Sequence, residues 1–95
     1  MSHLFSRPTA SLTTSVFYVL LSLSSEDRHR TEILRDVTLS SAGRVKMGLP
    51  GLNATLRRLS EAGLVVSVDN RYRLTRGGRA ELAIELEKLA RSRRR

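Results

Sequence analysis

The spacing of apolar residues changes along the chain, and each change marks a new element. Residues 12–23 are mostly apolar, interrupted by Thr and Ser, and predict a buried helix. One face of this helix collects Leu12, Val16, Val19 and Leu23, whereas Phe17 and Leu21 lie on the other. A helix that is apolar on two faces is expected to pack against two surfaces, here the domain core and a partner subunit.

A second helix is predicted from about residue 28 to 38, after the polar break at 24–27, with Ile33, Leu34 and Val37 turned inward. Residues 40–48 read as a loop. Val45 and Met47 alternate within it, so a short strand is expected there that could pair with a later hairpin. Pro50 suits the first turn of a third helix.

Residues 52–79 carry the strongest local signals. Leu52, Leu56 and Leu59 recur at the spacing of one helix face, and the opposite face carries Ala54, Arg57, Arg58 and Glu61. Gly63 is placed to end this helix with a positive φ. Strand-like alternation follows on both sides of Asp69-Asn70, a dipeptide that favours a two-residue hairpin turn. The return strand places Arg71 and Arg73 on one face and Tyr72 and Leu74 on the other, and Thr75 is a candidate cap for a last helix.

That last helix is predicted from about residue 78 to 92, with a stripe made of Leu82, Leu86 and Leu89. The stripe could close the core of its own chain, but a dimer seam is the favoured interpretation because three helices and a hairpin already supply a core. The fold class is therefore mainly α with a small β-hairpin wing, a winged helix-turn-helix plus a C-terminal dimerisation helix. We expect a flexible arm at 1–10, a DNA-binding domain at 11–76, the dimerisation helix at 77–92 and a basic tail at 93–95.

Composition narrows the function. The chain has 95 residues and a formal net charge of +8, which favours a polyanionic partner, although a soluble basic protein with no nucleic-acid role would share that charge. It has no cysteine, no phosphate-cradling loop and no paired histidine and carboxylate at a useful spacing, so we expect no enzyme activity, no cofactor and no metal site. The apolar run at 12–23 is too short to span a bilayer, so no membrane partner is expected and the protein is predicted to be cytoplasmic.

An ordered set of residues resembles the PadR-type transcriptional regulators over about residues 12–90. The matching segments are Phe17-Tyr18-Val19-Leu20-Leu21, His29, Glu32-Ile33-Leu34, Thr55-Leu56-Arg57-Arg58-Leu59, Glu61-Ala62-Gly63-Leu64-Val65, Tyr72-Arg73-Leu74-Thr75 and Gly78-Arg79. The resemblance implies a homodimeric repressor on a palindromic operator, with the C-terminal helix packed on the partner's N-terminal region. Two segments depart from the family: His29-Arg30-Thr31 replaces His-Gly-Tyr, and Pro50-Gly51-Leu52-Asn53 replaces Gly-Thr-Leu-Tyr, so that Asn53 stands where the family has a DNA-contacting tyrosine.

The expected partners are double-stranded DNA and a second copy of the chain; a small-molecule inducer at the dimer interface follows from family analogy only. The DNA-binding candidates are Arg30, Arg44, Lys46, Gly51, Asn53, Ala54, Arg57, Arg58, Arg71 and Arg73. The dimer-interface candidates are Phe17, Leu21, Leu82, Leu86 and Leu89. Charge on the hairpin also protects an edge strand, a role compatible with phosphate contact. The alternative function is a winged-helix protein-interaction module that has lost operator recognition.

Overall fold

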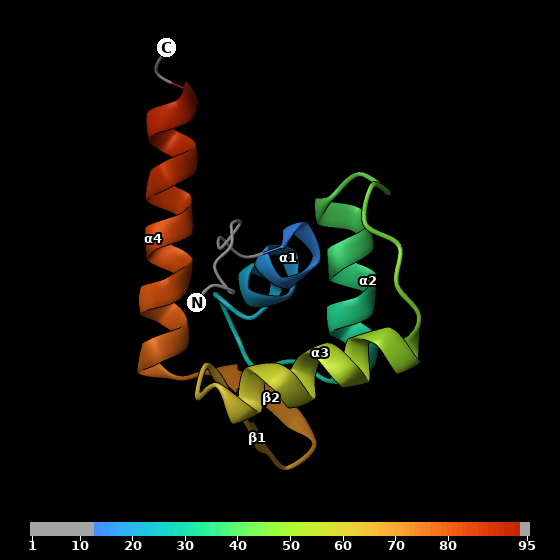
Figure 1. The fold of residues 1–95 in the computed structure, drawn as a ribbon. Helices are drawn as coiled ribbons and strands as arrows, with labels where there is room; N and C mark the ends of the chain where they lie inside the picture. The colour runs from blue at the N-terminus through green and yellow to red at the C-terminus, as the bar shows by residue number, and fades with distance from the viewer. Residues whose placement is uncertain (1–12, 94–95) are drawn as a thin grey trace, which may run out of the picture.

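The computed structural model describes residues 13–93 and contains four helices and one antiparallel hairpin (Figure 1). The elements are α1 (Thr14–Ser22), α2 (Arg30–Ser40), α3 (Leu49–Glu61), β1 (Val65–Val68), β2 (Arg71–Leu74) and α4 (Arg76–Arg93). Helices α1 to α3 surround the core, the hairpin follows α3, and α4 runs from the hairpin past α1 and projects away from the body. This is the winged helix-turn-helix architecture that the sequence predicted.

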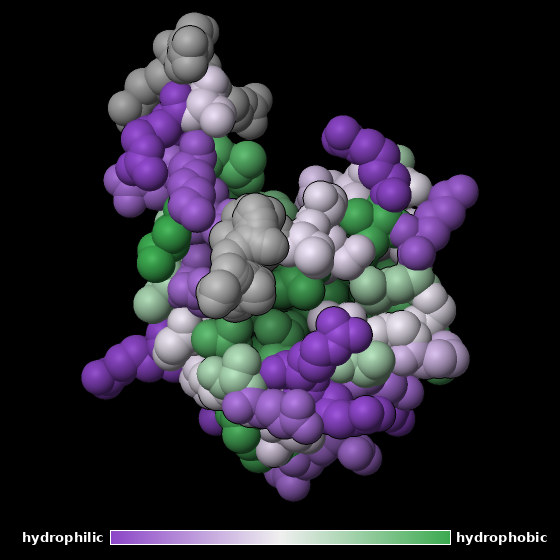
Figure 2. Space-filling model, in the orientation of Figure 1, coloured by the Kyte–Doolittle hydropathy of each residue, from purple (hydrophilic) through white to green (hydrophobic). Residues whose placement is uncertain are grey.

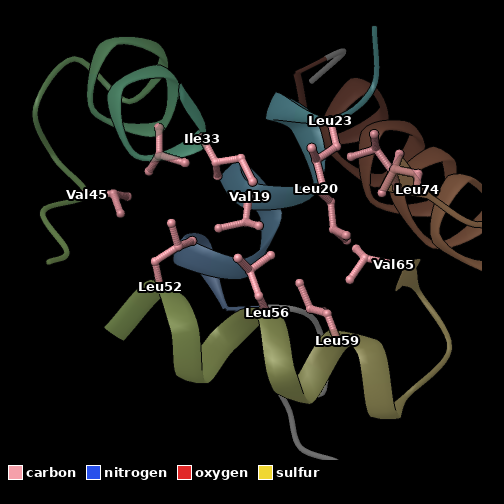
Figure 3. Packing of buried hydrophobic residues seen from close by; sticks show 12 residues of the cluster. Val19, Leu20, Leu23, Ile33, Val45, Leu52, Leu56, Leu59, Val65 and Leu74 are labelled. Carbon is pink, nitrogen blue, oxygen red and sulfur yellow. The ribbon is translucent and has the colours of Figure 1, made fainter. Parts of the chain in front are cut away.

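The core lies between α1, α2 and α3 and is closed by one residue from each strand (Figure 3). Its buried apolar members are Val19, Leu20, Leu23, Ile33, Val37, Val45, Leu52, Leu56, Leu59, Val65, Leu74 and Leu82. The predicted leucine face of α3 points into this core, which fixes the opposite face of the helix toward solvent. Burial of each such side chain contributes about 1.5–3 kcal/mol before entropy is subtracted.

Local hydrogen bonds explain where α3 and the hairpin begin and end. Gly63 has a φ of +79° and closes α3 with two bonds of a Schellman motif: its N–H donates to Ser60, and the N–H of Leu64 donates to Leu59. Asp69 and Asn70 have φ values of +52° and +66°, the left-handed pair that a type I′ turn requires. Both predictions are confirmed.

A further segment pairs with the hairpin, but it is not the one predicted from the sequence. Residues 45–48 form no strand, so the strand expected around Val45 and Met47 is wrong: Val45 is buried in the core, and the N–H of Val45 donates to the hydroxyl of Ser41. Instead Arg28 forms an antiparallel bridge with Tyr72 through two backbone hydrogen bonds of 2.8 and 3.1 Å. The segment before α2 thereby becomes a third, one-residue edge of the hairpin sheet.

Helix bounds differ from the predicted ones by about two residues. Helix α1 starts later than residue 12 because the hydroxyl of Thr13 caps it by accepting from the N–H of Val16 at 3.2 Å. Helix α2 starts two residues later than predicted because the bridge to Tyr72 keeps Arg28 extended, and it ends two residues later, at Ser40. Helix α4 starts at Arg76, directly after its predicted cap Thr75, whose hydroxyl accepts from the N–H of Gly78 at 3.0 Å.

Of the five residues expected at a dimer seam, three pack on the core of their own chain and two are exposed. Leu82 is only 4 % exposed and belongs to the core of its own chain, which corrects its assignment to a seam. Phe17 and Leu21 are half-buried against the same core, so α1 does not leave them wholly free as expected. Leu86 and Leu89, by contrast, are 43 % and 47 % exposed on the projecting part of α4. None of the described helices combines the length and apolar character needed to cross a membrane.

The proposed arm at 1–10 lies outside the described residues, as do Arg94 and Arg95 of the tail. The expected domain boundaries therefore stay predictions.

Candidate nucleic-acid interface

Helix α3 presents a basic face away from the core. Burial of Leu52, Leu56 and Leu59 leaves Arg57 and Arg58 exposed. Within residues 13–93, neither guanidinium forms an ion pair or a side-chain hydrogen bond. Two adjacent guanidinium groups without a partner in this part of the chain are available for an anion.

The first turns of α3 carry small residues on their outer side. Gly51 is exposed and Ala54 is half-exposed, so no long side chain covers the backbone there. Asn53 lies at the wing-facing side of α3 and accepts a hydrogen bond through Oδ1 from Nη1 of Arg30, at 3.2 Å. Arg30 is the first residue of α2, so this bond joins the start of α2 to the first turns of α3.

A groove of about 320 Å³ runs between α3 and the hairpin. Its lining brings together three of the predicted site residues with four that were not predicted: Arg30, Asn53, Leu56, Arg57, Ser60, Ser67 and Tyr72. Ser67 and Tyr72 are cross-strand partners, and they share the inner face of the hairpin with Val65 and Leu74. Period-2 alternation in the sequence was the signal that could have placed them there. Figure 2 shows hydrophilic side chains gathered over α3 and the hairpin.

The hairpin arginines lie on the outer face, away from this groove, and both are paired with carboxylates. Arg73 contacts Asp27 with Nη2 2.8 Å from Oδ2, and Arg71 lies 3.8 Å from Oε1 of Glu32. Arg71 also donates to the backbone carbonyl of Asp27 at 3.3 Å. The assignment of Arg71 and Arg73 to DNA contact stays a prediction, and the structure adds that each shares its charge with a carboxylate from the segment before or within α2.

These contacts lower the pKa values of the two carboxyl groups, Asp27 and Glu32. Hydrogen bonds from Arg73 hold the pKa of Asp27 below its ordinary value of 3.8, and the charges of Arg73 and Arg71 act in the same direction. The backbone N–H of His29 donates to Glu32 at 2.8 Å and lowers the pKa of Glu32 below 4.5, with a further contribution from Arg71. Asp27 in turn raises the pKa of Arg73. Both acids are thus ionised at neutral pH.

His29 joins the hairpin turn to the start of α2. It is the N-cap residue of α2, and its Nδ1 lies 3.1 Å from the carbonyl oxygen of Asn70. His29 therefore has a structural place at a helix start, between the hairpin turn and α2. The same turn and helix start enclose a polar pocket of about 250 Å³ lined by His29, Arg30, Thr31, Asn70 and Tyr72.

Arg44 and Lys46 are exposed in the loop before α3 and do not line the groove. Nε of Arg44 donates to the carbonyl of Ser41 at 3.4 Å, a weak contact that leaves most of the guanidinium in solvent. Their side chains add charge near the start of α3, whereas the groove itself is built from α2, α3 and the hairpin.

Comparison with known proteins gives no matching protein-family model and no matching curated sequence. Solved structures do match. The hsRosR-S4 complex is 24% identical, covers 85% of this chain and 73% of that chain, and has a TM-score of 0.75. A transcriptional regulator from Clostridium thermocellum, Cth-833, is 19% identical, covers 83% of this chain and 85% of that chain, and has a TM-score of 0.69. At these identities the likeness establishes the fold.

Proposed function

We propose that the protein is a DNA-binding transcriptional regulator. The observation that carries the proposal is the pair Arg57 and Arg58, exposed on the outer face of α3 beside a hairpin and without partners among residues 13–93. The fold, shared with a structure described as a transcriptional regulator, supports the same role. A DNA partner would also place the protein in the compartment that holds the chromosome, in line with the expected cytoplasmic location.

In this proposal α3 enters the major groove, which is wide enough for a helix. Gly51 and Ala54 let the first turns approach the base edges, while Arg57 and Arg58 reach bases and phosphates. The hairpin lies beside the DNA backbone, and Arg30 and Asn53 contact the DNA from the groove between α2, α3 and the hairpin. Arg44 and Lys46 contribute through charge near the start of α3.

The proposal includes a homodimer on a palindromic operator. Support comes from α4, an 18-residue helix that packs on the core through Leu82 and then continues past it, exposing Leu86 and Leu89. An open pocket of about 220 Å³ between α1 and α4 has a mixed polar and apolar lining of Thr14, Phe17, Tyr18, Glu85 and Leu89, which a second copy could fill. A two-fold axis through such a contact would set two α3 helices about 34–36 Å apart, one helical turn of DNA. The repressor role rests on the PadR resemblance.

A band-shift titration with the gene's own upstream DNA tests the proposal. Each phosphate neutralised by the protein should contribute about −0.9 to the slope of log K against log salt. The double variant Arg57→Ala/Arg58→Ala should lose the shift, whereas Arg91→Ala, which removes a charge paired with Glu87 on α4, should keep it. A slope near zero in the wild-type protein, or equal affinity for the double variant, would contradict DNA binding through α3.

A second candidate function is a winged-helix protein-interaction module. It draws support from the paired arginines of the hairpin and from an apolar groove of about 450 Å³ on the outer side of α2, lined by Thr31, Leu34, Arg35, Thr38, Leu39, Met47 and Leu49. The same titration separates the two candidates. Failure to shift either upstream or random DNA at low salt favours the interaction module.

A further inference from the structure

The bond between Arg30 and Asn53 fixes which end of the Asn53 amide faces outward. A guanidinium carries only donors, so the atom turned toward Arg30 must be Oδ1, the acceptor of the 3.2 Å hydrogen bond. The amide NH₂ of Asn53 is then directed away from Arg30. Asn53 is half-exposed on the groove between α3 and the hairpin, where a bound duplex would meet that NH₂ group.

The charged groups on this part of α3 are donors as well. Arg57 follows Asn53 by four residues, lines the same groove and lies one helical turn further along. Arg58 adds a second guanidinium, and guanidinium groups have no acceptor. The carboxylate of the helix is at its last residue, Glu61, beyond both arginines. From Asn53 to Arg58, the face offers strong donors and no charged acceptor.

We propose that α3 selects guanine in each half-site. Asn53 Nδ2 and the Arg57 guanidinium each donate to the acceptors N7 and O6 of a guanine. Arg30 is the residue that positions Asn53. This inference rests on the proposed DNA-binding function. Guanine presents two acceptors in the major groove. Adenine pairs with asparagine through both amide atoms, but here Arg30 occupies Oδ1 and sets a positive charge beside it, which disfavours the donor N6 group of adenine.

The spacing along α3 restricts where the two contacts fall. Asn53 and Arg57 are separated by one turn, about 6 Å at 1.5 Å per residue. Stacked base pairs are about 3.4 Å apart along one strand. The two side chains therefore reach base pairs within about two steps of each other, and the guanines they select should be adjacent or separated by one base pair.

Selection of duplexes from a randomised pool by the full-length protein tests the base choice. We expect enriched half-sites with guanine at one or two positions, and a loss of about 5- to 150-fold in affinity when such a guanine is replaced by 7-deazaguanine, which lacks N7. Enriched sites without guanine, or unchanged affinity for the deaza duplex, would overturn the inference while DNA binding stands. No enrichment and no binding at low salt would instead refute the proposed function.

The positioning role of Arg30 is tested with Arg30→Ala. Release of Oδ1 should let the Asn53 amide rotate and read adenine, so selection with this variant should give adenine and guanine at the Asn53 position. The control is Arg35→Ala, which removes the same charge from an exposed site on α2 that lines a different groove. It should weaken binding slightly and leave the selected bases unchanged. Equal base preferences in the two variants, with unchanged melting temperatures, would overturn the role of Arg30.

Discussion

Arg73 holds Asp27 through both of its carboxylate oxygens. Nη2 of Arg73 donates to Oδ2 at 2.8 Å, and Nε lies 3.2 Å from Oδ2 and 3.3 Å from Oδ1. The two residues are neighbours because Arg28 bridges Tyr72, which sets the residue before Arg28 opposite the residue after Tyr72. The ion pair therefore ties the hairpin to the segment that leads into α2.

This pair should give the protein an acid-sensitive stability. The pKa of Asp27 is lowered in the folded state, so the stabilisation is complete above the unfolded pKa near 3.8 and is lost as pH falls through the lower folded value. Urea unfolding measured between pH 6 and pH 2 should show this loss in the wild-type protein. Asp27→Asn should flatten that part of the profile, although the lowered pKa of Glu32 leaves a residual slope. An identical acid profile in the variant would contradict the assignment.

Asp27 should also restrain the affinity of the hairpin for DNA. Its carboxylate neutralises Arg73, and both side chains are partly exposed to solvent. We expect Asp27→Asn to raise affinity for all DNA sequences and to steepen the salt slope by about 0.9, the effect of one more phosphate contact. Glu87→Gln, which frees Arg91 on α4, is the matched control and should change neither quantity. Unchanged binding by Asp27→Asn would show that Arg73 lies away from the DNA.

The arginines of α3 and of the hairpin should contribute differently. Arg57→Ala or Arg58→Ala should cost about 1–3 kcal/mol on the preferred site and relax base preference, if each makes a bidentate contact to guanine. Arg71→Ala and Arg73→Ala should weaken specific and random DNA alike, and by less, because both arginines are already paired with carboxylates. Competition band-shifts with specific and random duplexes measure this. Equal losses on both duplexes for all four variants would refute the division.

A side chain at position 78 should destabilise the fold, because Gly78 packs against neighbouring backbone. A Cβ at this position would overlap the carbonyl oxygen of Leu64 and press on Leu74. Gly78→Ala should therefore destabilise the fold by about 1–3 kcal/mol, the range for overpacking. Gly77→Ala is the control, because its Cβ would meet ordinary contacts and should gain up to about 1 kcal/mol from helix propensity. Equal melting temperatures for the two variants would contradict the packing argument.

Assembly through α4 can be tested by placing an aspartate on either of two opposite faces of the helix. Leu86 and Ile84 are similarly exposed, at 43 % and 49 %, but only Leu86 lies on the stripe with Leu82 and Leu89. Leu86→Asp should weaken the proposed dimer by about 100-fold or more, since desolvating an unpaired polar group costs several kcal/mol. Ile84→Asp should leave the dimer intact. A wild-type monomer at micromolar concentration in sedimentation, or equal effects of both changes, would refute the seam.

Predictions from short segments of sequence were the most successful. The stop at Gly63, the turn at Asp69-Asn70 and the cap at Thr75 each depend on residues within a few positions, and the structure confirms all three. The inward face of α3 was also predictable, because Leu52, Leu56 and Leu59 recur on one face of the helix over about two turns.

The failures concern contacts between distant residues. The pair Asp27 and Arg73 spans 46 residues, and it forms through the Arg28 bridge, which no local pattern marks. The strand expected at Val45 failed because alternation over three residues also fits a loop that buries one side chain. Leu82 was assigned to a seam because the sequence does not show that α4 packs on α1 at that level.

The hydroxyl of Thr75 joins two helices as well as capping one. It donates to the carbonyl of Gly63 at 2.6 Å, just after α3, and accepts from the N–H of Gly78 at 3.0 Å, in the first turn of α4. Gly78 lies so close to Leu64 that a side chain would not fit between them, so the start of α4 packs directly on the segment that follows the end of α3. If two copies assemble through α4, the angle at this joint sets the distance between their α3 helices, and the protein would favour operators whose half-sites have the matching separation.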